Sequence, residues 1–418
     1  MGSVPQEPVI LIVSHVVPHP PAAGNEIRIL KMMEWLRSTG FSVVLLLNHD
    51  PLPPERLAAL ESVVNSVHFI GDDYGELTAP ARSCSCSDLA EKLALALPDS
   101  GLYRACFGMS REKKTRSNDV KRYLASERLR QVTGHLAEHY RPAAVMAEYI
   151  FAAPCLDAIP DGIFKIIDTH DMFSRKKEQV LAFGVDDPLP CTPGEERGYL
   201  LKSDLVIAIQ SNEARMFRGL VMEREVVTVG IDFDVVPEID NKSVVPGTVL
   251  VVGSDNPLNV HGLREFYLNA WPAVRAGHPE AVLRVVGKLA KHLDTGDERV
   301  QLAGWVPDLD EEYRRAAVVI NPTVAGTGLK IKSVEALCHA KALIGTPNSV
   351  EGIEYCGEAP YRVCEDWCEF GRTVLALLHS GTKRAALQQR AWDFACENFS
   401  TEKVYAPLRR KLQGLLAH

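Results

Sequence analysis

The sequence lacks several features that would place it in a specialised class. Its formal net charge is -8, so Lys and Arg are not in excess, which argues against a general nucleic-acid-binding protein. No stretch approaches the roughly 20 apolar residues that span a bilayer, and its start does not resemble a signal peptide. The ten cysteines are scattered, without a paired CxxC or Cys/His set, which disfavours a metal site and favours reduced thiols. We therefore expect a cytoplasmic protein.

Short β-branched runs instead alternate with longer helical patterns, which is typical of βαβ units and parallel sheets. The 418 residues are enough for two domains. In the first half the predicted strands are 9–15, 42–48, 66–71, 143–149, 164–171, 204–210 and 225–230. In the second half they are 249–254, 281–288, 300–306, 316–322 and 341–347. The stretch 235–248, which contains Pro237, Pro246 and Gly247, is the predicted linker.

The pattern predicts an α/β fold of two Rossmann-like, doubly wound domains. The carboxyl ends of the two parallel sheets should face each other across a cleft, where ligands bind in such folds. The expected boundaries are 1–238 for the first domain and 239–395 for the second. Residues 396–418 are expected to form a helix that packs back on the first domain.

The stretch "NPTVAGTGLKIKSVEALCHAKALIGT" combines features of an anion-binding site. Gly326 and Gly328 allow backbone N–H groups to approach a ligand, and the following helix presents its positive end. Lys330 and Lys332 add full charges there, although the spacing matches neither GxxxxGK[ST] nor GxGxxG. Glu335, about one turn further on, can accept hydrogen bonds from sugar or ribose hydroxyls. The alternative is a solvated helix start with a salt-bridging glutamate.

This stretch resembles the donor-binding segment of glycosyltransferase family 4, the retaining transferases of the GT-B fold, in the branch with the pattern "GxGIKxKxLEAxAxGxPVV". Other blocks are similar in the same order: "SHVVPHPPAAGNEIRILKMMEWLRSTGFSVVLL", "FKIIDTHD", "SDLVIAIQSNEARMF", "VVGSDNPLNVHGLREFYLNAWPAVRAGHPEAVLRVVGK" and "VQLAGWVPDLDEEYRRAAVVINP". The similarity covers approximately 10–50 and 160–355. It implies a nucleotide-diphosphate sugar donor on the second domain, an acceptor on the first, and no metal or other cofactor.

The resemblance also implies roles for residues of the second domain. Glu335 matches the glutamate that binds the donor ribose, whereas Thr327 stands where the family has its other glutamate. The family usually carries an Arg and a Lys at the places of Ser254 and His261, so other cations would have to compensate. The residues expected at the donor are Ser254, His261, Lys288, Gly326, Thr327, Gly328, Leu329, Lys330, Lys332 and Glu335.

In the first domain, "DTHD" ends a predicted strand with Asp168, His170 and Asp171. By the resemblance, His170 lies beside the donor sugar and one of the aspartates orients it; the alternative is a satisfied strand-end histidine. The two aspartates also resemble a DxD metal motif. We do not adopt that interpretation, because GT-B enzymes stabilise the leaving diphosphate with helix dipoles and basic residues.

Three further features belong to the first domain. Gly24 and Asn25 lie in the loop before the first helix, which is expected to approach the donor, and Arg28 is expected on the acceptor side. The alternative is a plain turn between a strand and a helix. Glu148 ends a strand and is expected to meet the acceptor or to form an ion pair. Residues 103–130 concentrate basic charge, which suits an anionic lipid surface. We expect peripheral contact with the inner face of the membrane, or a solvated helix.

The expected function is retaining transfer of a sugar from a nucleotide-diphosphate sugar to an acceptor hydroxyl, on a glycan, a lipid-linked or a small-molecule acceptor. Two alternatives remain open. One is a sugar-nucleotide 2-epimerase of the same fold, and the other is a non-catalytic, partner-dependent subunit that binds a nucleotide sugar.

Overall fold

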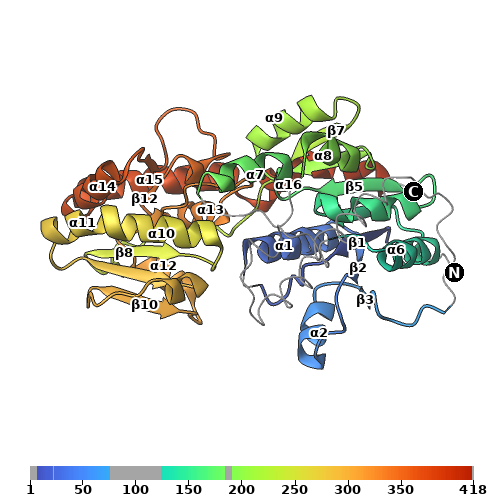
Figure 1. Ribbon diagram of the computed structural model, residues 1–418, viewed down its shortest axis with the longest axis horizontal. Coiled ribbons are helices and arrows are strands. Elements are labelled where there is room, and N and C mark those ends of the chain that lie inside the picture. Colours follow the sequence, from blue (N-terminus) through green and yellow to red (C-terminus); the bar gives the residue numbers. More distant parts are fainter. Residues whose placement is uncertain (1–6, 22, 76–123, 184–190, 417–418) are drawn as a thin grey trace, which may run out of the picture.

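The computed structural model describes residues 7–21, 23–75, 124–183 and 191–416. Figure 1 shows two α/β domains side by side, each built on a parallel sheet with helices packed around it. The two-domain, doubly wound architecture predicted from the sequence is confirmed.

The first domain has a parallel sheet of seven strands among the described residues, in the order β3-β2-β1-β4-β5-β6-β7. The inner strands are apolar and buried on both faces, as parallel sheets require. The strands are β1 (Val9–Ser14), β2 (Ser42–Leu47), β3 (Ser66–Phe69), β4 (Ala144–Glu148), β5 (Phe164–Asp168), β6 (Leu205–Ala208) and β7 (Glu225–Thr228). The helices are α1 (Gly24–Ser38), α2 (Pro54–Glu61), α6 (Glu127–Tyr140), α7 (Phe173–Leu181), α8 (Pro193–Leu200) and α9 (Ser211–Leu220), with a 3₁₀ segment η1 (Ile150–Ala158).

The second domain has a six-stranded parallel sheet in the described part of the chain, in the order β10-β9-β8-β11-β12-β13. Its strands are β8 (Thr248–Val252), β9 (Val282–Val286), β10 (Val300–Gly304), β11 (Val318–Asn321), β12 (Leu343–Gly345) and β13 (Arg362–Val363). Its helices are α10 (Pro257–Asn269), α11 (Trp271–Gly277), α12 (Leu309–Arg315), α13 (Ile331–Cys338), α14 (Trp367–His379) and α15 (Gly381–Asn398). Short 3₁₀ segments are η2 (Lys288–His292) and η3 (Asn348–Val350).

After α15 the chain returns to the first domain as α16 (Thr401–Leu412), followed by η4 (Gln413–Leu415). The apolar residues of α16 join the first domain's core, and Tyr405 stacks on Trp35 of α1 with ring centroids 4.5 Å apart. Figure 1 shows α16, in red, against the first domain. The two domains are therefore connected twice, by the segment before β8 and by the one between α15 and α16.

All twelve predicted strands are present, but each ends earlier than predicted, because the last residues of each run turn into the loops at the carboxyl edge. The prediction missed β13, which has only two residues. Of the basic segment 103–130, only the last few residues are described, and they lead into α6; the rest lies outside the described residues. Within the described part of the chain, no helix combines the length and apolarity needed to cross a bilayer.

Candidate functional site

Two residues with unusual backbone conformation lie at the carboxyl ends of the neighbouring strands β4 and β5. Tyr149 has φ 67° and His170 has φ 59°, a region that non-glycine residues seldom adopt. Their rings are stacked, with centroids 4.1 Å apart and planes 7° from parallel. Such strained residues concentrate at functional sites. The conformation of His170 also explains why β5 stops at Asp168, although the sequence predicted a strand to residue 171.

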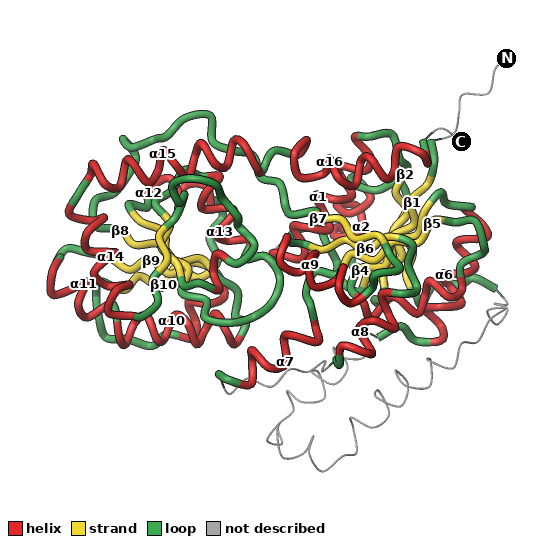
Figure 2. The backbone as a smooth tube through the Cα atoms, turned by 90° about the horizontal axis from the view of Figure 1, so that it is seen from above, coloured by secondary structure: helices red, strands yellow, loops and turns green. Residues whose placement is uncertain are grey.

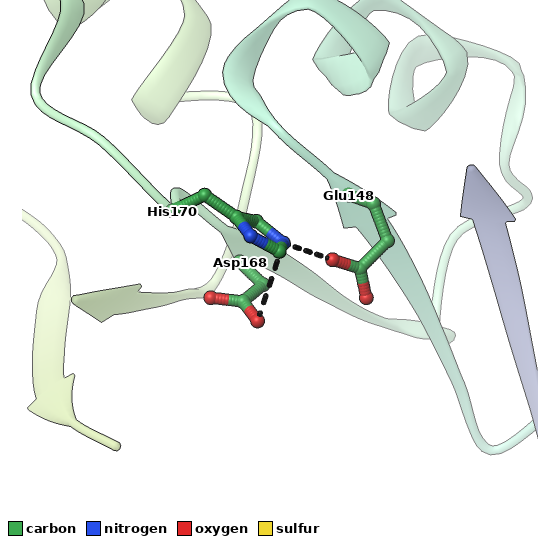
Figure 3. Close-up of side chains that lie close together, drawn as sticks. All are labelled: Glu148, Asp168 and His170. Carbon is green, nitrogen blue, oxygen red and sulfur yellow. Dashed lines mark hydrogen bonds and ion pairs between the residues drawn. The ribbon is translucent and has the colours of Figure 1, made fainter. Parts of the chain in front are cut away.

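His170 is at the centre of a buried polar cluster with Glu148 and Asp168 (Figure 3). Its Nε2 lies 2.6 Å from Glu148 Oε2 and 3.7 Å from Asp168 Oδ2. Burial raises the pKa of Glu148, and the hydrogen bond to His170 offsets part of that increase. Nε2 is therefore occupied by Glu148, and any hydroxyl bound by the His170 ring has to use Nδ1. Glu148, expected at the acceptor or in an ion pair, is completely buried.

Arg28 was expected on the acceptor side, but in the structure it is bound to Asp168, a member of this cluster. Its side chain is 1% exposed and binds Asp168 through two hydrogen bonds, Nε–Oδ2 at 3.0 Å and Nη2–Oδ1 at 2.7 Å. Nη1 donates to the carbonyls of Val229, at 2.9 Å, and Gly230. Burial opposes the charge of Arg28, but the attraction of Asp168 outweighs it and raises the pKa of the guanidinium. Arg28 thus fixes the carboxylate that lies beside His170.

The loop between β11 and α13, residues 322–330 (the glycine loop), lies directly against the first domain. Gly328 has φ 76°, and a Cβ atom there would lie 2.7 Å from Asp171 Oδ1 and 2.8 Å from the His170 carbonyl oxygen. Only glycine fits this position without displacing its neighbours. Thr327 Oγ1 also donates to Asp171 Oδ1 at 3.1 Å. The structure therefore brings the two sequence motifs, from different domains, into contact.

Lys330 and Lys332 were expected to act alike, but the structure separates them. The Lys330 ammonium donates to three carbonyls of its own loop, those of Gly326 at 2.9 Å, Gly328 at 3.2 Å and Thr327 at 3.3 Å. Burial lowers the pKa of Lys330, and Asp171 opposes that effect. The charge of Lys330 therefore holds the glycine loop in shape.

Lys332 extends instead toward the end of β8. A Cβ atom on Gly253, the residue after that strand, would lie 3.4 Å from Lys332 Nζ. Burial, together with Lys330, lowers the pKa of Lys332 to about 8. Lys332 Nζ has no hydrogen-bond partner among the residues that the structure describes. It therefore supplies an unpaired cation next to Ser254, where the resemblance implied an arginine; Ser254 Oγ itself accepts from Asn259 Nδ2 at 3.1 Å.

Glu335 lies one turn further along α13 and is hydrogen-bonded by Tyr313 of α12. The Tyr313 hydroxyl donates to Glu335 Oε2 at 2.9 Å, and burial raises the pKa of Glu335. Tyr313 is completely buried and stacks on His339, with centroids 4.4 Å apart. Tyr313 thus orients the carboxylate that was expected to bind ribose, a role that the sequence did not reveal.

The remaining predicted residues lie around this centre. Figure 2 shows α13 on the side of the second domain that faces the first, and a Cβ atom on Gly24 would lie 2.8 Å from Ile331 Cδ1. Gly24 therefore allows the starts of α1 and α13 to meet, and the neighbouring Asn25 is half-buried. His261 packs edge-on against Phe183, with centroids 5.3 Å apart. Lys288 is exposed at the start of η2, and Leu329 is partly buried against the second domain's core.

No residue in "SDLVIAIQSNEARMF" was among the predicted site residues, although this block was part of the resemblance. Glu213, in the first turn of α9, is completely buried, and its Oε1 accepts the Gly328 N–H at 2.7 Å. The sequence did contain a signal for Glu213, because a glutamate in the first turn of a helix that follows a buried strand lies at the edge of the sheet where ligands bind. Its partner is 115 positions away in the sequence and in the other domain, so the contact itself could not be predicted.

The solved structures that this chain resembles define its fold class. The complex of Anabaena HepE with UDP and glucose has a TM-score of 0.62 at 13% identity, covering 97% of this chain and 100% of that chain. Sucrose-phosphate synthase from Thermosynechococcus elongatus has a TM-score of 0.63 at 15% identity, covering 98% and 99%. The pneumococcal O-GlcNAc transferase GtfA, in complex with UDP and GlcNAc, has a TM-score of 0.66 at 10% identity, covering 99% and 100%. The fold is GT-B.

The family comparison goes further than the fold. Residues 246–380 match the family described as Glycosyl transferases group 1, whereas no curated protein matches the sequence. The second domain thus matches a group 1 glycosyltransferase domain, within a chain that has the GT-B fold. The predicted resemblance is confirmed at this level.

Proposed function

We propose that this protein transfers a sugar from a UDP-sugar to a sugar acceptor, with retention of anomeric configuration. The observation that carries the proposal is Lys332, a partly buried cation at the end of β8, close to the start of α13, whose Nζ has no hydrogen-bond partner among the described residues. A diphosphate at this point would meet both Lys332 and the positive end of the helix. Two structurally similar proteins, HepE and GtfA, were solved with UDP, which supports UDP as the first nucleotide to test.

The expected chemistry depends mainly on electrostatic stabilisation. Negative charge develops on the departing diphosphate, and preorganised cations and helix dipoles stabilise it before the reaction starts. The contact between the glycine loop and the His170 segment supports a closed site that limits hydrolysis of the donor. The buried carboxylates of Glu148 and Asp168 are already bound to His170 and Arg28. This supports transfer assisted by the leaving group rather than by a carboxylate nucleophile.

We also propose that transfer needs no metal ion. Glu148, Asp168 and His170 offer ligand atoms within 4.8 Å of one another, which resembles a metal site. However, Arg28 binds both oxygens of Asp168, and its positive charge repels a cation at this position. The cluster therefore fits a buried ion-pair network better than a metal centre.

The test is to incubate the protein with UDP-glucose, UDP-GlcNAc and a panel of sugar acceptors in EDTA, and to analyse the products by NMR. We expect UDP release and a new glycoside with the anomeric configuration of the donor. Conversion of the donor to an epimer without acceptor would instead indicate an epimerase. Nucleotide binding without turnover, with activity restored by a second protein, would indicate a partner-dependent subunit.

Tyr313→Phe is expected to raise the KM for the UDP-sugar about fivefold and to leave kcat nearly unchanged. The substitution removes the hydrogen bond that orients Glu335, and a lost hydrogen bond of this kind costs about 1 kcal/mol. The matched control is Tyr267→Phe, which removes a tyrosine hydrogen bond to Thr295 elsewhere in the second domain. Steady-state kinetics should show wild-type KM for the control; an unchanged KM for Tyr313→Phe would contradict the ribose-binding role of Glu335.

A further inference from the structure

Two side chains of the first domain bind both backbone groups of one residue in the glycine loop. Glu213 Oε1 accepts the Gly328 N–H at 2.7 Å, and Gln210 Nε2 lies 3.5 Å from the Gly328 carbonyl oxygen. Gln210 is the N-cap residue of α9, and Glu213 is three residues later in its first turn. Residues three apart lie on the same side of a helix. The start of α9 therefore presents a matched acceptor and donor to the N–H and the C=O of a single residue.

This arrangement is buried and leaves polar atoms without partners. Gln210 is 2% exposed and Glu213 is completely buried. Among the described residues, Gln210 Oε1 and Glu213 Oε2 have no hydrogen-bond partner. A buried polar atom without a partner is unfavourable, because it loses its hydrogen bonds to water without replacement. Apolar side chains would join the two domains at lower cost, so this pair is better explained by what it does to the glycine loop.

The same carboxylate also connects the glycine loop to the segment that carries His170. The backbone N–H of Met172, two residues after His170, favours the charged form of Glu213. Gly328 lies against the same segment, since a Cβ atom on it would be 2.8 Å from the His170 carbonyl oxygen and 2.7 Å from Asp171 Oδ1. Glu213 therefore occupies the junction between the donor-side loop and the strand end of the first domain.

We propose that Gln210 and Glu213 are positioning residues that hold the glycine loop in its donor-binding shape and hold the two domains closed. They act through Gly328, because they fix the orientation of the two peptide groups that flank it. The Gly328 carbonyl is one of the three that bind the Lys330 ammonium. This inference rests on the proposed function for its catalytic consequence, but the contact itself can be tested without a donor.

The charges around Glu213 make this contact sensitive to pH. Burial, with a contribution from Asp171, raises the pKa of Glu213 to about 8, while the Gly328 N–H and Lys330 oppose the increase. Asp171 forms an ion pair with Lys176, and the negative charge of Glu351 raises the pKa of Lys330. When the domains are closed, Glu213 therefore keeps its proton up to about pH 8. When Glu213 is exposed to water, it loses that proton near its ordinary pKa of 4.5. The free energy that favours the closed form therefore falls as the pH rises from about 4.5 to about 8.

The direct test is hydrogen exchange of the peptide that covers residues 322–332, in the wild type and in Glu213→Ala, Glu213→Gln and Gln210→Ala. We expect Glu213→Ala to speed exchange of this peptide at least about tenfold, because the Gly328 N–H loses its acceptor. Glu213→Gln should restore protection, since its amide oxygen can accept the same bond. Gln210→Ala should show a smaller increase.

The control is Glu196→Gln. Glu196 is also completely buried, but it binds the backbone N–H groups of Phe173 and Ser174 within the first domain. Its replacement should leave exchange of residues 322–332 unchanged. If Glu213→Ala exchanges like the wild type in this peptide, the proposal is overturned. Should Glu213→Ala fail to fold, Gln210→Ala decides: it must exchange faster than the wild type, or the proposal fails.

The kinetic consequence is tested with UDP-glucose between pH 6.5 and 9.5. We expect kcat of Glu213→Ala to fall about thirtyfold, with retention of most activity in Glu213→Gln. Wild-type kcat at saturating UDP-glucose should decline as the pH rises from 6.5 to about 8, and Glu213→Gln should lack this decline because it stays neutral. A Glu213→Ala enzyme with wild-type kcat and pH profile would contradict the positioning role. If the wild type does not bind UDP at all, the proposed donor is wrong, and the exchange experiment still decides the contact.

Discussion

Replacement of Lys332 by methionine is expected to weaken the binding of UDP about a hundredfold. Methionine keeps most of the length and apolar volume but removes the partly buried cation at the end of β8 that has no partner among the described residues. Loss of a buried, charge-assisted contact costs about 3 kcal/mol, which corresponds to roughly two orders of magnitude in Kd. Isothermal titration calorimetry measures this change directly.

The pH dependence of UDP binding gives a second signature of Lys332. Its ammonium is charged below about pH 8 and loses its proton above that value. A bound diphosphate favours the charged form, so binding should take up a proton, and the affinity should fall as the pH rises beyond 8. The terminal phosphate of UDP, with a second pKa near 6, stays fully ionised in that range. Lys332→Met should lack this decline.

Lys341→Met is the matched control for Lys332→Met. Lys341, which follows α13, is buried, and burial likewise lowers its pKa to about 8, but its ammonium donates to the Arg314 carbonyl of α12 at 3.1 Å. This variant should bind UDP with wild-type affinity and the same pH dependence. Equal losses in both variants would mean that a buried lysine matters only for folding, and the role assigned to Lys332 would be wrong.

Replacement of Arg28 by methionine is expected to destabilise the first domain by about 3–5 kcal/mol. The substitution leaves the completely buried Asp168 carboxylate without its two hydrogen bonds, and a buried charge without a partner carries a penalty of that size. Urea unfolding followed by circular dichroism measures the effect. The double variant Arg28→Met/Asp168→Asn should recover part of the lost stability, because it removes the unpaired charge.

The exposed ion pair of Arg197 with Glu223 provides the comparison for Arg28. Both side chains are well exposed, at 41% and 52%, and such pairs contribute at most about 1 kcal/mol. Arg197→Met should therefore unfold close to the wild-type urea concentration. A similarly small effect of Arg28→Met would show that Arg28 is not the residue that holds the Asp168 carboxylate in place.

The fold could be predicted from sequence because the information for it is local. Parallel strands that are buried on both faces appear as continuous β-branched runs, and the order of those runs gave both sheets almost completely. β13 was missed because a two-residue strand carries no such pattern. The prediction for 164–171 was too long because the backbone of His170 turns out of the strand, which composition does not reveal.

The site could be predicted only in part, because its contacts join distant positions. Arg28 and Asp168 are 140 positions apart, and Glu213 and Gly328 are 115 apart in different domains. Arg28 and Asp168 were therefore predicted separately from the sequence. Arg28 was placed on the acceptor side, whereas in the structure it binds Asp168. It also treated Lys330 and Lys332 as equivalent. Their different roles depend on which neighbours each ammonium can reach.

The central claim is that the second domain and the glycine loop form a site for a nucleotide diphosphate. The most direct measurement is a thermal-shift series of the wild-type protein with UDP, GDP, dTDP, ADP and CMP. We expect stabilisation by UDP, of roughly 2.7 kcal/mol at about 100 times its Kd, and little or none by CMP, which lacks the second phosphate. No stabilisation by any of the diphosphates would contradict the proposed site.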